Sequence, residues 1–111
     1  ANNYITTHDF TTGQYIPDRT FDLIWCVEFV EHVEKVYVKN FLETFKHGKI
    51  LLMTFAPPNQ GGKHHVNLQN APYWTNRLYK DWEVDKVTTK HIRDNTLIHP
   101  YMDRATVRIR K

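Results

Sequence analysis

The chain has 111 residues, of which 41% are hydrophobic and 24% are charged, and it carries a net charge of +3. This balance is typical of one globular domain with one modest core, and it excludes a disordered chain. The mild positive charge permits a nucleic-acid partner but does not indicate one.

The first half of the chain reads as strand, helix and strand. An apolar run rich in β-forming residues, FDLIWCVEF (21–29), predicts a buried strand. Apolar residues then recur at i, i+3, i+4 and i+7 over 38–45, which indicates an amphipathic helix, and we expect Gly48 to stop it. A second apolar run, KILLMTFAPP (49–58), predicts another strand. Two strands that are apolar on both faces indicate a parallel sheet covered by helices.

A polar loop with two glycines, PPNQGGKHHVN (57–67), leads into the second half of the chain. Asn70 follows as a predicted helix N-cap, with a proline in the first turn. We expect a short helix there whose one face carries Trp74, Leu78 and Trp82, because these residues are spaced by four.

Three segments complete the chain. WEVDKVTT (82–89) predicts a weaker strand, and DNTLIHPYMD (94–103) predicts a loop. In ATVRIRK (105–111), apolar residues at odd-numbered positions alternate with polar ones, which predicts an edge strand with Arg108 facing outward. The order of elements therefore indicates an α/β fold with parallel strands and an antiparallel end.

Membrane and secretion signals are missing from the sequence. The longest apolar run, 50–58, is too short to span a bilayer, and the first residues lack a basic start followed by an apolar core. The single cysteine, Cys26, excludes an internal disulfide and fits a reducing compartment. We therefore expect a cytoplasmic protein.

An E-x-x-E-H motif, formed by Glu28, Glu31 and His32, directly follows the first predicted strand. If the turn there is helical, Glu28 faces both other residues, and so much negative charge converges only around a cation or a proton. His65 or His64, in the loop after the next parallel strand, opens on the same edge of the sheet and completes the set. Such ligands suit Mg²⁺, Mn²⁺, Fe²⁺ or Zn²⁺ better than Ca²⁺.

Two other interpretations of the motif stay open. The glutamates can favour the dipole of a helix N-terminus and wall a pocket that holds no metal. The histidines of the loop can also simply face solvent. The pattern alone does not choose among these alternatives.

The ordered set FDLIWCVEF … KILLMTFAPP, with HDF upstream, resembles the fourth strand, the next helix and the fifth strand of class I S-adenosylmethionine-dependent methyltransferases. The resemblance implies a Rossmann-like C-terminal half of that fold, as one domain over 1–111. The family's glycine-rich G-x-G-x-G loop is not formed by the four glycines of this chain, Gly13, Gly48, Gly61 and Gly62. We therefore expect a partial domain that lacks half of the cofactor site and is inactive alone.

The resemblance also implies cofactor contacts. Asp9 and Phe10 match the pair that contacts adenine in the family, although HD before TTG is also good turn chemistry. The end of the first strand would contact the methionine part of the cofactor through Trp25, Cys26, Val27 and Glu28. For Cys26 the alternative is a buried small hydrophobe.

The E-x-x-E-H turn resembles the metal site of ubiquinone-pathway O-methyltransferases and small-RNA 2′-O-methyltransferases. In those families the cation holds hydroxyl oxygens of the methyl acceptor. The resemblance implies four ligands here, with His65 preferred over His64: Glu28, Glu31, His32 and His65.

The function implied is methyl transfer from S-adenosylmethionine to an oxygen or nitrogen of an unidentified acceptor. Two other classes stay open: a non-catalytic fragment that self-associates without binding cofactor, and a metal- or RNA-binding module on the same half fold. A half sheet leaves an open edge strand and an uncovered apolar face, so we expect a homo-oligomer formed through that edge. The basic residues near the end are most simply a solvated face, with phosphate contact as the alternative; they are Lys90, Arg93, Arg104, Arg108 and Arg110.

Overall fold

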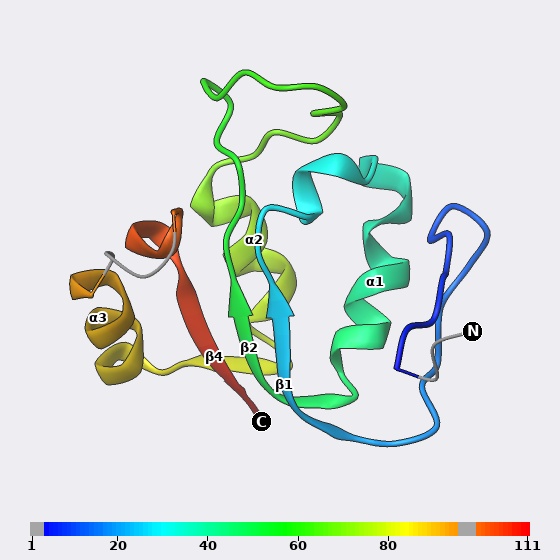
Figure 1. Ribbon diagram of the computed structural model, residues 1–111, viewed down its shortest axis with the longest axis horizontal. Helices are drawn as coiled ribbons and strands as arrows, with labels where there is room; N and C mark the ends of the chain where they lie inside the picture. The colour runs from blue at the N-terminus through cyan, green and yellow to red at the C-terminus, as the bar shows by residue number, and fades with distance from the viewer. Residues whose placement is uncertain (1–3, 96–99) are drawn as a thin grey trace.

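Four strands form one mixed sheet in the computed structural model, which describes residues 4–95 and 100–111 (Figure 1). The strands are β1 (Phe21–Cys26), β2 (Gly48–Met53), β3 (Trp82–Val84) and β4 (Thr106–Arg110), in the order β1-β2-β4-β3. β1 and β2 are parallel, whereas β4 runs antiparallel to both of its neighbours. The α/β class, the parallel pair and the antiparallel final strand are confirmed.

Three α-helices connect or flank these strands: α1 (Val38–Phe45), α2 (Ala71–Leu78) and α3 (Lys86–Asp94). Short 3₁₀ turns precede α1 and β4; they are η1 (Val30–His32), η2 (Lys35–Tyr37) and η4 (Met102–Arg104). Both α1 and α2 lie where the sequence predicts them, and Asn70 occupies the N-cap of α2. Within 4–95 and 100–111, no helix is both long and apolar enough to cross a membrane.

The main core lies between one face of the sheet and the helices α1 and α2. Phe41 of α1 and Trp74 of α2 are buried against Leu51 and Met53 of β2. Fully burying side chains of this size stabilises the fold by roughly 1.5–3 kcal/mol each. The i, i+3, i+4 pattern of α1 is therefore the stripe that faces this core.

The prediction of one strand over 82–89 is wrong, because β3 ends at Val84 and α3 begins at Lys86. Asp85 caps this helix: its Oδ1 accepts the N–H of Thr88 at 3.0 Å and its Oδ2 accepts the Thr88 hydroxyl at 2.6 Å. The β-branched residues after Asp85 have a low helix propensity and therefore predict a strand. The Asp85 cap favours the helix and opposes that low propensity. Trp82, predicted on α2, begins β3 instead and joins the same core.

The prediction that β4 is an edge strand is also wrong, because β4 lies between β2 and β3. Where β3 ends, α3 continues along β4. Thr89 accepts the Val107 N–H at 2.9 Å, and Arg93 Nε donates to the Ala105 carbonyl at 2.7 Å. Arg108, predicted to face outward, is consequently only 7% exposed, whereas Ile109 is 46% exposed. Part of the predicted loop 94–103, residues 96–99, lies outside the described residues.

The other face of the sheet carries exposed apolar side chains, here called the open face. Phe21, Leu23 and Trp25 alternate along β1, and each is more than 40% exposed. The strand register pairs Leu23 with Ile50 and Ile50 with Ile109, so these exposed residues form one row across three strands. β1, which carries Leu23 at one end of this row, is an end strand of the sheet. Large contiguous apolar patches are uncommon on the surfaces of monomeric soluble proteins.

Candidate metal centre

A cluster of a carboxylate and two imidazoles lies beyond the carboxyl ends of the two parallel strands. β1 ends at Cys26, and the backbone of Glu28 then adopts a left-handed conformation, with φ of 52°. Such a φ is uncommon for a residue other than glycine, and it is found at sites that the surrounding structure holds in place. The turn leads directly into η1, which carries Glu31 and His32.

His65 reaches the same place from the loop that follows β2. The N–H groups of Val66 and Asn67 both donate to the Glu31 carbonyl at 3.0 Å, and these two bonds fasten the loop onto η1. Gly62 makes room for the His65 ring: its φ is 150°, and a Cβ there would lie 2.6 Å from the ring. The sequence predicts this meeting of two loops at one edge, and the structure brings them together.

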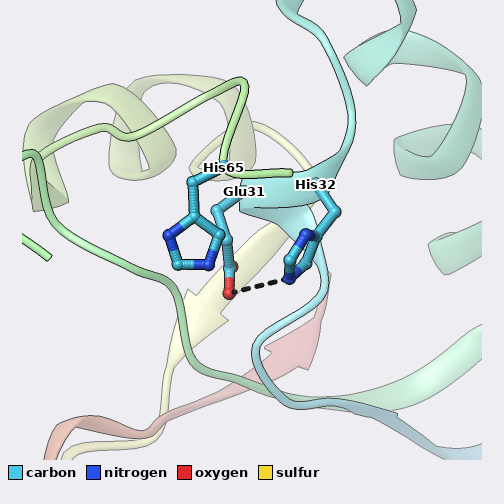
Figure 2. Close-up of side chains that lie close together, drawn as sticks. All are labelled: Glu31, His32 and His65. Atoms are coloured by element: carbon cyan, nitrogen blue, oxygen red, sulfur yellow. Dashed lines mark ion pairs between the residues drawn. The ribbon is translucent and has the colours of Figure 1, made fainter. Parts of the chain in front are cut away.

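Glu31, His32 and His65 point toward one another (Figure 2). One potential ligand atom from each side chain lies within 4.8 Å of the other two. Glu31 Oε2 is 3.9 Å from His32 Nε2. Ligand atoms that share one ion at about 2.1 Å lie no more than about 4.2 Å apart, so a cation would draw the three side chains slightly together.

The Glu31 carboxylate is 1% exposed, and neither of its oxygens accepts a hydrogen bond from the residues that the structure describes. Burial raises the pKa of Glu31, and the neighbouring carboxylate of Glu28 raises it further. The backbone N–H groups of Glu31 and Ala56 oppose this pKa rise only in part, because neither reaches hydrogen-bond geometry. A buried carboxylate without a hydrogen bond is costly unless a proton or a cation neutralises it.

The imidazoles of His32 and His65 each have a ring nitrogen that could coordinate an ion beside Glu31. His32 Nδ1 donates to the His64 carbonyl at 3.0 Å, so the neutral His32 ring presents the lone pair of Nε2 toward Glu31. His64 thus contributes its carbonyl rather than its ring, and its backbone is left-handed, with φ of 59°. His65 stacks edge-on against His32 with ring centroids 4.8 Å apart, and its buried Nδ1 has no partner among the described residues.

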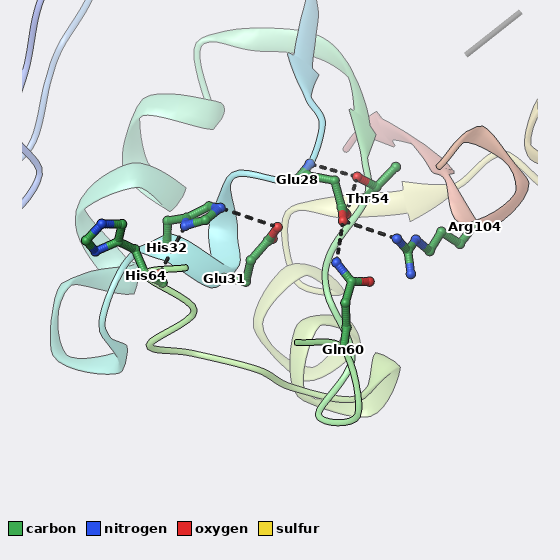
Figure 3. A network of polar contacts seen from close by, with 7 residues as sticks. All are labelled: Glu28, Glu31, His32, Thr54, Gln60, His64 and Arg104. Carbon is green, nitrogen blue, oxygen red and sulfur yellow. Dashed lines mark hydrogen bonds and ion pairs between the residues drawn. The ribbon is translucent and has the colours of Figure 1, made fainter. Parts of the chain in front are cut away.

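Glu28, predicted both as a metal ligand and as a cofactor contact, lies outside this cluster (Figure 3). Its carboxylate accepts hydrogen bonds from Thr54 at 2.9 Å, Gln60 at 3.1 Å and Arg104 at 3.2 Å. Glu28 thereby ties the ends of β1 and β2 to the loop and to η4. Sequence reasoning missed these three partners, because they lie 26 to 76 residues from Glu28 and belong to no motif with it.

The predicted adenine pair borders the metal cluster. Asp9 Oδ1 accepts the N–H of Thr11 at 2.9 Å and the Thr11 hydroxyl at 2.8 Å, so Asp9 also holds the turn that its sequence suggested. Phe10 packs edge-on against Phe29 in the core. A cavity of about 330 Å³ is lined by Asp9, Phe10 and His32, among others. One cavity therefore touches both the predicted adenine pair and one predicted metal ligand.

The other predicted cofactor residues diverge. Cys26 is buried in the main core, and burial raises the pKa of its thiol far above the ordinary value. Val27 packs against a second apolar cluster, which includes Leu52 and Val107. Trp25 lies on the open face and is 56% exposed. None of these three side chains lines the cavity beside Asp9 and His32.

In comparisons with known proteins, no family model, no curated protein and no solved structure matches the chain.

Proposed function

We propose that the chain binds one divalent transition-metal ion through Glu31, His32 and His65, and that it forms the C-terminal half of a class I S-adenosylmethionine-dependent methyltransferase fold. The observation that carries the proposal is the Glu31 carboxylate, buried without a hydrogen-bond partner and faced by two imidazoles. A cation supplies the charge that this arrangement otherwise lacks.

The composition of the cluster narrows the choice of metal. One carboxylate and two imidazoles are the ligands of catalytic Zn²⁺ and of non-haem Fe²⁺ sites, whereas Mg²⁺ prefers oxygen ligands alone. Three protein ligands leave at least one position for an oxygen of the acceptor. A cation there would lower the pKa of an acceptor hydroxyl and orient it toward the methyl donor.

Two observations support the methyl-donor part of the proposal. The cavity beside His32 also contacts Asp9 and Phe10, the pair that the resemblance assigns to adenine. The cluster also lies where the two parallel strands end, which is the ligand-binding edge of open α/β sheets.

Titration calorimetry is the direct test of this proposal. We expect Zn²⁺ or Mn²⁺ to bind metal-stripped protein at a ratio of one ion per chain. We expect only weak binding of S-adenosylmethionine and S-adenosylhomocysteine, because the chain has no G-x-G-x-G loop to approach the cofactor. The absence of any cation binding would contradict the metal centre. Tight cofactor binding would show instead that this chain alone builds a complete cofactor site.

The open face favours a second candidate function, self-association. Leu23, Ile50 and Ile109 form an apolar row with a charged residue at each margin. Arg19, which also forms an ion pair with Asp18, lies against Phe21, and Glu83 pairs with Ile109. A second copy related by a two-fold axis along the strands would bring the basic margin of each chain toward the acidic margin of the other. We therefore propose that a second copy of this chain covers the open face beside β1.

Sedimentation velocity tests this interface. We expect a dimer for the natural chain and a monomer for Leu23→Lys, since a lysine on an exposed strand opposes pairing without disturbing the monomer core. Val87→Lys is the matched control, because Val87 is 82% exposed on α3 and lies outside the open face. A natural chain that stays monomeric at high concentration, or a Val87→Lys variant that also dissociates, would rule out the interface.

A further inference from the structure

A cleft separate from the metal centre is lined by residues of α2, α3, β3 and β4. Its volume is about 620 Å³, within the range of small-molecule sites. None of the three metal-cluster residues lines it, so inferences about it do not depend on the proposed function. We call it the Arg108 cleft, after its most unusual residue.

Arg108 is a buried cation without a counter-ion. Its side chain lines the cleft, the residue is only 7% exposed, and its guanidinium makes no hydrogen bond or ion pair with any described residue. Burial lowers the pKa of Arg108 to about 10, and the like charge of Arg93 makes a smaller contribution to this decrease. The Arg108 nitrogens are not among the fully buried side-chain atoms without a partner, so they are accessible from the cleft. A guanidinium so largely removed from water normally has a carboxylate or several acceptors as partners, because desolvating an unpaired charge is costly.

Most other ionic groups of the cleft are already paired or exposed. Lys90 forms an ion pair with Asp94, and Arg104 donates to Glu28. Arg93 donates to the Ala105 carbonyl and to the Thr106 hydroxyl at 3.0 Å. The cleft as a whole has five basic side chains against two acidic ones. The basic residues are Lys86, Lys90, Arg93, Arg104 and Arg108, and the acidic residues are Asp94 and Asp103. Its electrostatic character is therefore that of an anion site.

We propose that the Arg108 cleft binds the phosphate group of a small phosphorylated molecule, with Arg108 as the principal phosphate ligand. A guanidinium offers a planar fork of donors that matches two phosphate oxygens. The Thr106 hydroxyl accepts from Arg93, so its own proton is free to donate to the same anion. Phe55, Ala71 and Val84 supply an apolar wall for the rest of the ligand.

The experiment compares Arg108→Met with Arg110→Met, in EDTA so that the metal centre is not involved. Arg110 is the matched control, because it lies two residues further along β4, is exposed and does not line the cleft. Inorganic phosphate replaces chloride at constant ionic strength while the melting temperature is measured, and AMP binding is measured by calorimetry.

We expect phosphate to raise the melting temperature of the natural chain and of Arg110→Met, and to leave that of Arg108→Met unchanged. AMP affinity should fall about ten-fold or more in Arg108→Met only, which is the usual worth of a hydrogen bond to a charged group. Arg108→Met should fold, because replacing a buried unpaired charge by an apolar side chain of similar length removes a desolvation cost. Arg108→Lys, which keeps the charge but loses the fork, should bind AMP more weakly than the natural chain.

Three results would overturn the proposal. These are no effect of phosphate or AMP on the natural chain, equal binding by Arg108→Met, and an equal loss in Arg110→Met. An oligonucleotide that binds more than ten-fold tighter than AMP would overturn the assignment to a small ligand. Amide shifts in the NMR spectrum on adding AMP should centre on Thr89 and Arg108, and shifts confined to other elements would place the anion elsewhere.

Discussion

Glu31→Gln is expected to stabilise the metal-free protein and to abolish its stabilisation by divalent cations. Glutamine keeps the shape of the side chain but removes a charge that is buried without a hydrogen-bond partner and has only the His32 imidazole, at 3.9 Å, as an ionic neighbour. Relief of that desolvation is worth about 1–3 kcal/mol, which corresponds to a melting temperature several degrees higher in a domain of this size. In the natural chain, a cation at a hundred times its dissociation constant adds about 2.7 kcal/mol, and the variant loses this gain.

The same residue sets a pH dependence. Burial raises the pKa of Glu31 in the folded state above its ordinary value of 4.5, so the folded protein holds this proton more tightly than the unfolded chain does. The stability of the metal-free protein therefore falls as the pH rises from that ordinary value through the folded pKa. Stabilisation by a bound cation rises with pH instead, because the cation requires a deprotonated carboxylate and neutral imidazoles. Glu31→Gln should lack both trends.

Thermal melts with EDTA and with Zn²⁺ or Mn²⁺, repeated from mildly acidic to neutral pH, measure these effects. Glu34→Gln is the matched control, because it removes a charge three residues away from an exposed side chain that is not in the cluster. It should behave as the natural chain does in every condition. A Glu31→Gln variant that is less stable without metal would indicate that Glu31 has a hydrogen-bonding role in the fold instead.

The meeting of Glu31, His32 and His65 could be predicted in large part from the sequence. Parallel strands open their following loops on one edge, and this brings His65 to Glu31 and His32. The position of Glu28 is not predicted correctly, because its spacing from Glu31 and His32 places it beside them only if the backbone is helical. Its φ of 52° turns the side chain toward Thr54 instead, and no local pattern announces that conformation.

Arg108 and α3 show where sequence patterns fail for a different reason. The alternation of 105–111 correctly predicts a strand, but which face is buried depends on what packs beside it. Thr89 and Arg93 bind the side of β4 only because α3 follows β3, and α3 was hidden by its β-branched residues. Because the sequence pattern did not predict α3, it placed Arg108 on the surface. The Arg108 cleft therefore could not be predicted.

Gly48→Ala is expected to destabilise the protein by about 2–3 kcal/mol, because overpacking a close contact in a core has this cost. A Cβ at Gly48 would lie 2.2 Å from Ile24 Cγ1 and 2.8 Å from Ile24 Cδ1. Ile24 cannot easily move aside, because its χ1 is stiff and its side chain packs against the main core. The melting temperature should fall by roughly 10 °C or more.

The sequence pattern predicts a different role for Gly48, namely that it stops α1. A stop glycine needs a left-handed backbone, where asparagine is the next best residue, so Gly48→Asn would then be tolerated better than Gly48→Ala. In the structure Gly48 begins β2 and is not among the positive-φ glycines, which are Gly13 and Gly62. Because its role is close approach to β1, Gly48→Asn should be at least as damaging as Gly48→Ala.

A double-mutant cycle with Ile24→Ala identifies the cause of the destabilisation. Removing the Ile24 branch should make the Gly48→Ala change cheaper by about 1–2 kcal/mol, a coupling expected only if the two side chains compete for one space. Gly61→Ala is the control, because a Cβ there meets no atom within 4 Å and its φ is not positive. Independent, additive effects of the Gly48 and Ile24 changes in chemical denaturation would show that the cost at Gly48 has another origin. A positive coupling would establish that β1 and β2, beyond whose carboxyl ends Glu31, His32 and His65 meet, are held at a spacing that only glycine permits.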